Sequence, residues 1–261
     1  MRWNNQRGSI TVEATISLTV FMFFIITILS LINVCRIQAK VAVAINAAAK
    51  EVSQYSYFYG LSGLHAAHSA LGASASETEE SINSVVSNTN ELYNSIQNIA
   101  ETGANTNIEN TGDVLSSWDT IMAEVKAGTA SVETLEQQIG EICSDPGKMI
   151  LGIGKIFISE AIDETVSRFL APPIAKTLCK KHFTEDIYND PDAYLESLGV
   201  EGGLDGIDFS NSKLFPGGEN KIEFVAVYKV KVIQLFPIEN EFVFCQTAST
   251  KGWLLGEKSE K

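Results

Sequence analysis

The amino-acid sequence predicts an α+β fold that is mainly helical. We expect a long N-terminal transmembrane and amphipathic helix, a helical hairpin, and a small C-terminal antiparallel β-hairpin or sheet. Three observations support this fold class. Residues 14–34 carry no charge. Apolar residues recur every three or four positions as far as residue 59, and again between 82 and 142. Every second residue over 222–232 is apolar, with Glu223, Lys229 and Lys231 between them, which is the period of a half-buried strand.

The uncharged run 14–34 is long enough to cross a membrane. At about 1.5 Å per residue, a helix of this length matches the roughly 30 Å hydrocarbon core of a bilayer. The run is apolar on every face, whereas a helix in a soluble core usually keeps a polar stripe. A signal peptide has a shorter apolar stretch followed by a small-x-small cleavage site, and residues 33–37 contain no such site. We therefore expect a retained single-pass membrane helix at 9–34.

Glu13 is a carboxylate at the very start of this apolar run. An ionised group in hydrocarbon costs about 2.5 to 3.5 kcal/mol on insertion scales, so we expect it to have either an oppositely charged partner or a functional role. One interpretation places Glu13 at the level of the lipid headgroups, where the N-terminal end of a helix favours an anion. The residues before Glu13 favour a different interpretation.

A short basic leader, a glycine and a glutamate five residues later precede the apolar run, and residues 7–14 read Arg-Gly-Ser-Ile-Thr-Val-Glu-Ala. This combination resembles the processing site of type IV pilin-like proteins, and most of all the TadE-like pseudopilins of tight-adherence (Flp) pilus systems. The first mature residue would be Ser9 rather than the aromatic residue of many major pilins. The resemblance implies that a prepilin peptidase cuts between Gly8 and Ser9 and removes leader 1–8. It also makes Glu13 an assembly residue that neutralises the new amine of its own or a neighbouring subunit.

The resemblance also implies a location and partners. Basic residues lie on both sides of the apolar run, so the positive-inside rule gives almost no orientation: they are Arg2 and Arg7 before it, and Arg36, Lys40 and Lys50 after it. A leader read by prepilin peptidase has to be cytoplasmic, which implies an extracytoplasmic C-terminal domain at the cell membrane. The expected partners are prepilin peptidase, other pilin-like subunits, the pilus assembly platform and membrane lipid. The formal net charge of −13 disfavours nucleic acid.

Beyond the membrane, residues 35–75 are expected to continue the helix and then form a hinge. The apolar positions have helical spacing; they are Ile37, Val41, Ala44, Ala48, Val52, Tyr55 and Tyr59. Gly60 begins a Gly- and Ala-rich hinge. His65 and His68 lie three residues apart there, but no nearby Cys or paired acidic residue completes a metal site.

Residues 76–145 are acidic, with thirteen Asp or Glu and only one basic residue, Lys126. Apolar positions with heptad-like spacing occur in two sets, 82–99 and 115–142, separated by an Asn-, Thr- and Gly-rich gap at 103–112. This pattern predicts a coiled-coil-like hairpin of two antiparallel helices. The alternative is a disordered acidic spacer, because many residues on the other faces are weak helix formers.

Residues 146–261 are expected to form an α+β extracytoplasmic unit. The apolar run 149–158 is about half the length of a membrane span and predicts a buried helix that continues to Pro172-Pro173. Further helices are expected around Leu178 and Phe183 and at 191–198, where Gly199 ends the last one. Strands are expected at 222–232 and 241–250, covered by helices, by a third strand near Phe209, or by both. The tail from 198 onwards also looks like the C-terminal part of longer TadE-like proteins of Gram-positive bacteria.

Four cysteines show no Cys-x-x-Cys spacing, and Cys143 and Cys179 could form a disulfide in an oxidising compartment. The sequence contains no phosphate loop, zinc-protease motif, nucleophile elbow or dinucleotide fingerprint. We therefore expect no enzyme, no cofactor and no metal. The resemblance predicts a minor pilin or pseudopilin-like component of a Tad or type IV-like pilus assembly or secretion system. The alternative is a membrane-anchored extracellular binding or adhesion protein with a coiled-coil stalk and no pilus role.

Overall fold

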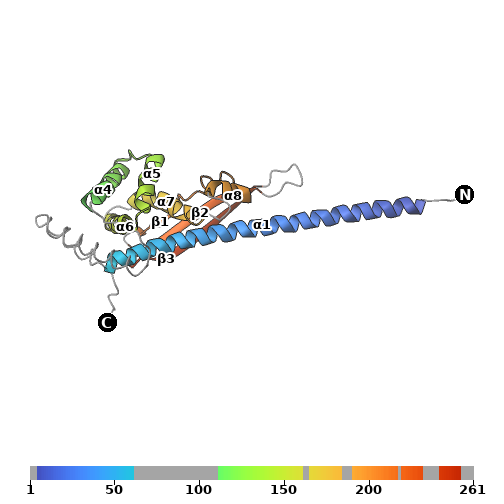
Figure 1. The fold of residues 1–261 in the computed structure, drawn as a ribbon, viewed down its shortest axis with the longest axis horizontal. Helices are drawn as coiled ribbons and strands as arrows, with labels where there is room; N and C mark the ends of the chain where they lie inside the picture. The colour runs from blue at the N-terminus through green and yellow to red at the C-terminus, as the bar shows by residue number, and fades with distance from the viewer. Residues whose placement is uncertain are drawn as a thin grey trace, which may run out of the picture.

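A single helix forms the axis of the molecule. The computed structural model describes residues 5–61, 111–160, 165–183, 190–216, 219–231 and 241–253. Helix α1 spans Asn5–Leu61, and the remaining described elements pack along its C-terminal half while its N-terminal half projects away from them (Figure 1). We call these remaining described residues, between 111 and 253, the head. The predicted fold class is confirmed, because the structure is mainly helical and ends in a three-stranded antiparallel sheet.

The C-terminal half of α1 is buried along the face that its sequence period predicts. Six of the seven positions with helical spacing are fully buried, and Tyr55 is partly buried. This face contacts α6, α7, β2 and β3. The described part of the helix runs through Gly60 to Leu61. The amphipathic continuation of the helix is therefore confirmed, and the hinge up to residue 75 lies outside the described residues.

The predicted acidic hairpin differs from the structure. Its first helix, 82–99, and most of its turn lie outside the described residues. Its second helix is two helices, α4 at Thr111–Ala127 and α5 at Val132–Cys143. Gly128 separates them with a φ of +68°, a backbone conformation that is unfavourable for residues with a side chain. Ser131 then restarts the chain as an N-cap, its Oγ accepting a hydrogen bond from the Thr134 N–H at 3.2 Å.

The two following helices each bury an apolar face in the core. Helix α6 spans Pro146–Glu160 and α7 spans Thr165–Lys180. The sequence interpretation ended a helix at Pro172-Pro173, which is wrong, because both prolines lie inside α7. Fully buried residues flank them on both sides; they are Leu170, Ala171, Ile174, Ala175 and Leu178. Their burial offsets the cost of interior prolines, which is about 3 kcal/mol or more each.

A short helix and the sheet complete the head. Helix α8, Pro191–Leu198, ends as predicted at Gly199, which has a φ of +99°. Strands β1 (Lys213–Leu214), β2 (Lys221–Lys231) and β3 (Glu241–Lys251) form an antiparallel sheet in the order β1-β2-β3. Alternate residues of β2 are buried on one face. On that face of β3, Gln246 Nε2 donates a hydrogen bond to the Gln38 carbonyl of α1 at 3.0 Å.

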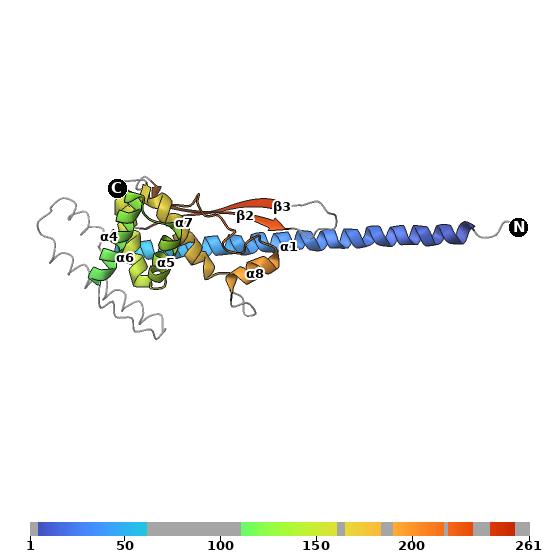
Figure 2. The same ribbon diagram turned by 90° about the horizontal axis from the view of Figure 1, so that it is seen from above.

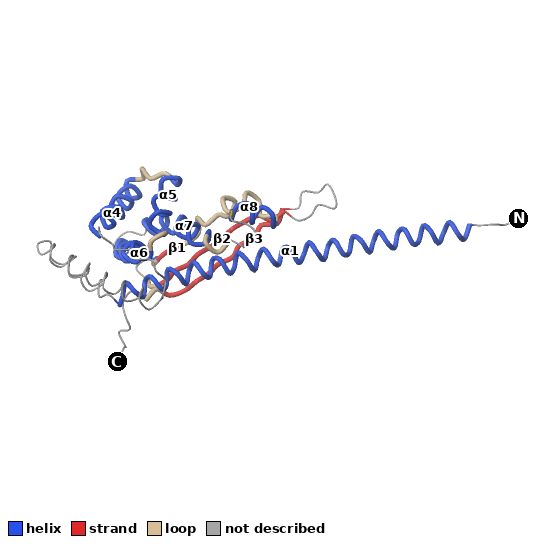
Figure 3. The backbone as a smooth tube through the Cα atoms, in the orientation of Figure 1, coloured by secondary structure: helices blue, strands red, loops and turns tan. Residues whose placement is uncertain are grey.

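All described parts of the head share one hydrophobic core with α1. Trp118 of α4 and Ile139 of α5 are fully buried in the same cluster as Met149 of α6 and Phe224 of β2. The helices and the sheet lie around the same half of α1, both in the view from above (Figure 2) and in the tube coloured by secondary structure (Figure 3). The described part of the predicted hairpin, α4 and α5, therefore shares its core with the helices and strands that follow residue 145.

Candidate functional site

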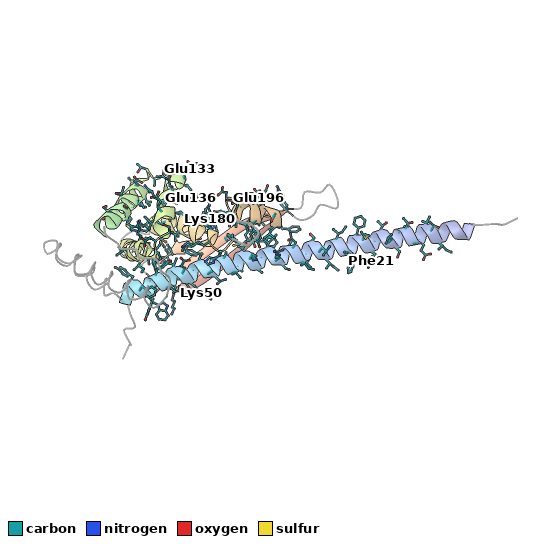
Figure 4. All side chains as sticks on the ribbon, in the orientation of Figure 1. Phe21, Lys50, Glu133, Glu136, Lys180 and Glu196 are labelled. Atoms are coloured by element: carbon teal, nitrogen blue, oxygen red, sulfur yellow. The ribbon has the colours of Figure 1, made fainter. Side chains whose placement is uncertain are left out.

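The N-terminal half of α1 is the most unusual surface of the molecule. Its large apolar side chains are exposed around the whole helix; Leu18 is 63% exposed and Phe24 is 62% exposed. Figure 4 shows the side chains around Phe21 projecting in several directions, with no other element beside them. Among the described residues this is the one helix long and apolar enough to cross a membrane, judged by length and composition. A lipid environment would remove this apolar surface from water.

The three threonines within the apolar run form hydrogen bonds within the helix itself. Thr15, Thr19 and Thr27 each donate a hydrogen bond to the carbonyl four residues earlier, all at 2.8 Å. Such bonds leave no hydroxyl donor unpaired in a bilayer, where an unsatisfied polar group is expensive. The hydroxyls are therefore compatible with a membrane environment.

The residues of the expected processing site lie at the start of the same helix. Helix α1 begins at Asn5, so the peptide bond between Gly8 and Ser9 lies within its first turns. Glu13 follows Ser9 by four residues, which places both on one helix face about one turn apart. Within the described part of the chain, the exposed Glu13 carboxylate has no ion-pair or hydrogen-bond partner. The helix therefore places this carboxylate within reach of an amine created at Ser9.

A polar cluster that the sequence reasoning missed joins α1 to the end of α7. Glu51 Oε1 accepts hydrogen bonds from Tyr55 Oη at 2.6 Å and from Lys181 Nζ at 3.1 Å. Lys181 Nζ also donates to the Cys143 carbonyl at 3.1 Å. His182 Nε2 lies 3.9 Å from Glu51 Oε2. The signal available in the sequence was Glu51 itself, an acidic residue between the buried positions 48 and 52 of an amphipathic helix.

The two cysteines of the predicted disulfide are both buried and both free. Cys143 Sγ contacts Met149 Sδ at 3.2 Å rather than a second thiol. Burial raises the pKa of the Cys143 thiol to about 12. The charge of Lys181 lowers this pKa and that of Glu51 raises it, and both effects are smaller than that of burial. Burial, with a further contribution from Glu51, raises the pKa of Cys179 to about 12. The structure thus contains two neutral thiols and no bond between them.

No described group of three or more His, Cys, Asp or Glu residues is arranged to hold a metal ion, and His65 and His68 lie outside the described residues. Lys176 Nζ contacts Glu136 Oε1 at 2.8 Å and Asp205 Oδ1 at 2.9 Å. This ion-pair group ties α5, α7 and the loop after α8 together.

Comparisons of the chain with protein-family models, with curated proteins and with solved structures found no match.

Proposed function

We propose that this chain is a pseudopilin-like membrane protein that acts as a minor component of a Tad or type IV-like pilus assembly or secretion system. The observation that carries the proposal is the division of α1. Its first half is apolar and is not covered by the other described residues, and its second half holds the whole described head. The motif at residues 7–14, which resembles that of TadE-like pseudopilins, lies at the free end of this helix.

The mechanism would be helix packing rather than chemistry. Prepilin peptidase cuts between Gly8 and Ser9 and leaves a positively charged amine one helical turn from Glu13. The carboxylate pairs with this amine in its own subunit or in a neighbour. A charge pair in a low-dielectric environment requires accurate geometry, so it sets the register of packed helices more than it adds stability. The head is then presented outside the membrane, because one uninterrupted helix connects it to the span.

Intact mass and N-terminal sequencing of the membrane-extracted protein test the proposal. The chain is expressed with and without a prepilin peptidase, and a Gly8→Leu variant serves as the matched uncut control. We expect a peptidase-dependent N-terminus at Ser9 in the unmodified chain and an N-terminus at Met1 in the variant. An unmodified chain that still begins at Met1 with an active peptidase present would overturn the pilin-like function. A membrane-anchored binding protein would then be the better hypothesis.

A further inference from the structure

One end of the head lies level with the end of the uncharged run of α1. Asn33 Nδ2 donates a hydrogen bond to the Leu198 carbonyl at the end of α8, at 2.8 Å. Val200, two residues later, forms an isolated antiparallel bridge with Val230 of β2. Val230 is paired in turn with Phe242 of β3. We call these five residues, Asn33, Leu198, Val200, Val230 and Phe242, the proximal layer.

The proximal layer lies where a membrane would end. At about 1.5 Å per residue, the run 14–34 extends for roughly 30 Å, so Asn33 lies at the edge of the hydrocarbon core if α1 spans it. Figures 1 and 2 both show α8 and the neighbouring ends of β2 and β3 beside α1 at the point where its free half begins. No linker separates the span from the head, because α1 is continuous there.

Two apolar side chains near the start of β3 are exposed: Phe242, which belongs to the proximal layer, and Val243, which follows it. Phe242 is 50% exposed and Val243 is 62% exposed, although both belong to a paired strand. Phe244, two residues further from the span, packs against the core and lies 5.8 Å, centroid to centroid, from the Tyr228 ring. On α1, the side chains of Leu31 and Ile32 at the same end are also exposed. Exposed apolar side chains therefore occur both at the end of the span and near the start of β3, where Phe242 and Val243 lie on opposite faces of the sheet.

Two described lysines near this surface form ion pairs. Lys229 Nζ lies 3.4 Å from Glu241 Oε2, and Lys231 Nζ lies 3.2 Å from Glu201 Oε1. Within the described part of the chain, each of these two lysines is balanced by a carboxylate near Phe242 and Val243. The two lysines also have long apolar stems, which can lie along an interface while their ammonium groups stay in water.

We propose that Phe242 and Val243 insert into the interfacial region of the same bilayer that holds α1. The head would then contact the membrane at two places, the helix and the start of β3, and the lipid would fix its tilt. Aromatic and apolar side chains at the headgroup level are a common anchor of this kind. This inference rests on the membrane-spanning part of the proposed function, but it does not depend on cleavage after Gly8 or on pilus assembly.

Fluorescence quenching of the full chain in liposomes tests the inference. Cys35 and Cys245, the exposed cysteines, are replaced by alanine, and the buried Cys143 and Cys179 are kept. A bimane label is then attached to Val243→Cys. Ser249→Cys is the matched control, because Ser249 is exposed and lies on the same face of the same strand further from the span. Phe21→Cys reports on the span itself.

We expect lipids with a doxyl group near the headgroup to quench the label at 243 strongly and the label at 249 weakly, and aqueous iodide to give the reverse order. Equal iodide access at 243 and 249, with lipid quenching at 21 only, would overturn the inference and leave the membrane span intact. Absence of lipid quenching at 21 would instead contradict the span on which the inference rests. Circular dichroism identifies any variant that fails to fold, and Phe242→Cys is then the second labelling position.

Discussion

Two glycines of α6 allow aromatic residues to pack directly against its backbone. A Cβ built on Gly154 would overlap the ring of Tyr59 in α1, and one built on Gly152 would overlap Trp118 in α4. We expect Gly154→Ala to lower the free energy of unfolding by about 1 to 3 kcal/mol through overpacking. Gly140→Ala, in α5 with open space around it, should raise it by about 1 kcal/mol through helix propensity. Urea unfolding of both variants in detergent measures the difference, and equal stability would contradict this packing.

Glu13 is the residue whose role depends most on the proposed function. Glu13→Gln keeps the shape of the side chain and removes its charge. Because an ionised group in the membrane costs about 2.5 to 3.5 kcal/mol, membrane insertion should be unimpaired or improved. Incorporation into the pilus assembly should be lost, since the Ser9 amine would have no partner. Carbonate extraction and co-purification with the assembled subunits measure the two effects. Normal incorporation of Glu13→Gln would show that the charge is not needed, and Glu13→Asp is the control that retains it.

At the scale of elements, Ser131 decides that α5 is a separate helix. Its Oγ accepts from the Thr134 N–H, which would otherwise be unpaired at the start of α5. We expect Ser131→Ala to lower the free energy of unfolding by about 1 kcal/mol. Ser131→Asp should keep most of the stability of the unmodified chain, because aspartate caps equally well. Chemical denaturation of the two variants checks this. A loss of equal size in both would argue against the cap.

The same region shows what the periodic pattern could and could not predict. Apolar spacing identified most of the buried positions of α4 and α5, including Trp118, Leu135 and Ile139, but it also included Val132, which is 71% exposed, and left out the buried Ile121. It did not reveal the break between them, because heptad-like spacing continues across a short turn whose geometry depends on Gly128 and Ser131. In α7 the opposite occurred, since a local rule ended the helix at Pro172-Pro173 and tertiary burial overrode it. Helix limits depended on local chemistry in one case and on packing in the other.

At the scale of the whole molecule, the sequence predicted the components better than their assembly. The long helix, α8, β2 and β3 follow from uncharged length, capping and alternation, which are local properties. The single core that joins α4 and α5 to α1 and the sheet depends on contacts between residues far apart in the chain, such as the bond from Asn33 to Leu198. The same limit applies to the candidate site. Glu13 is visible as a charge beside an apolar run, whereas the Glu51 cluster exists only once α1 and α7 meet.

The buried thiols make the stability of the whole molecule depend on pH. Burial raises the pKa of Cys143 and Cys179 from an ordinary 9.0 to about 12, so above pH 9 the unfolded chain releases protons that the folded chain keeps. Their contribution to stability is complete below pH 9 and is lost as the pH rises towards 12, at about 1.4 kcal/mol per pH unit for each thiol. Burial also raises the pKa of Tyr228 to about 12, so a smaller slope should remain without the cysteines.

Urea unfolding between pH 8 and pH 11 measures this dependence. Replacing Cys143 and Cys179 by alanine should make the free energy of unfolding fall less steeply with pH. The slope should decrease by about 1.4 kcal/mol per pH unit for each cysteine, which corresponds to one proton. The cavities left by the missing sulfur atoms lower stability equally at every pH, so they do not affect the slope. Cys245→Ala is the matched control for removing a cysteine, because Cys245 is exposed and lies outside the core. An unchanged slope in the double variant would mean that the folded chain already ionises these thiols, and that the core around the end of α7 admits water.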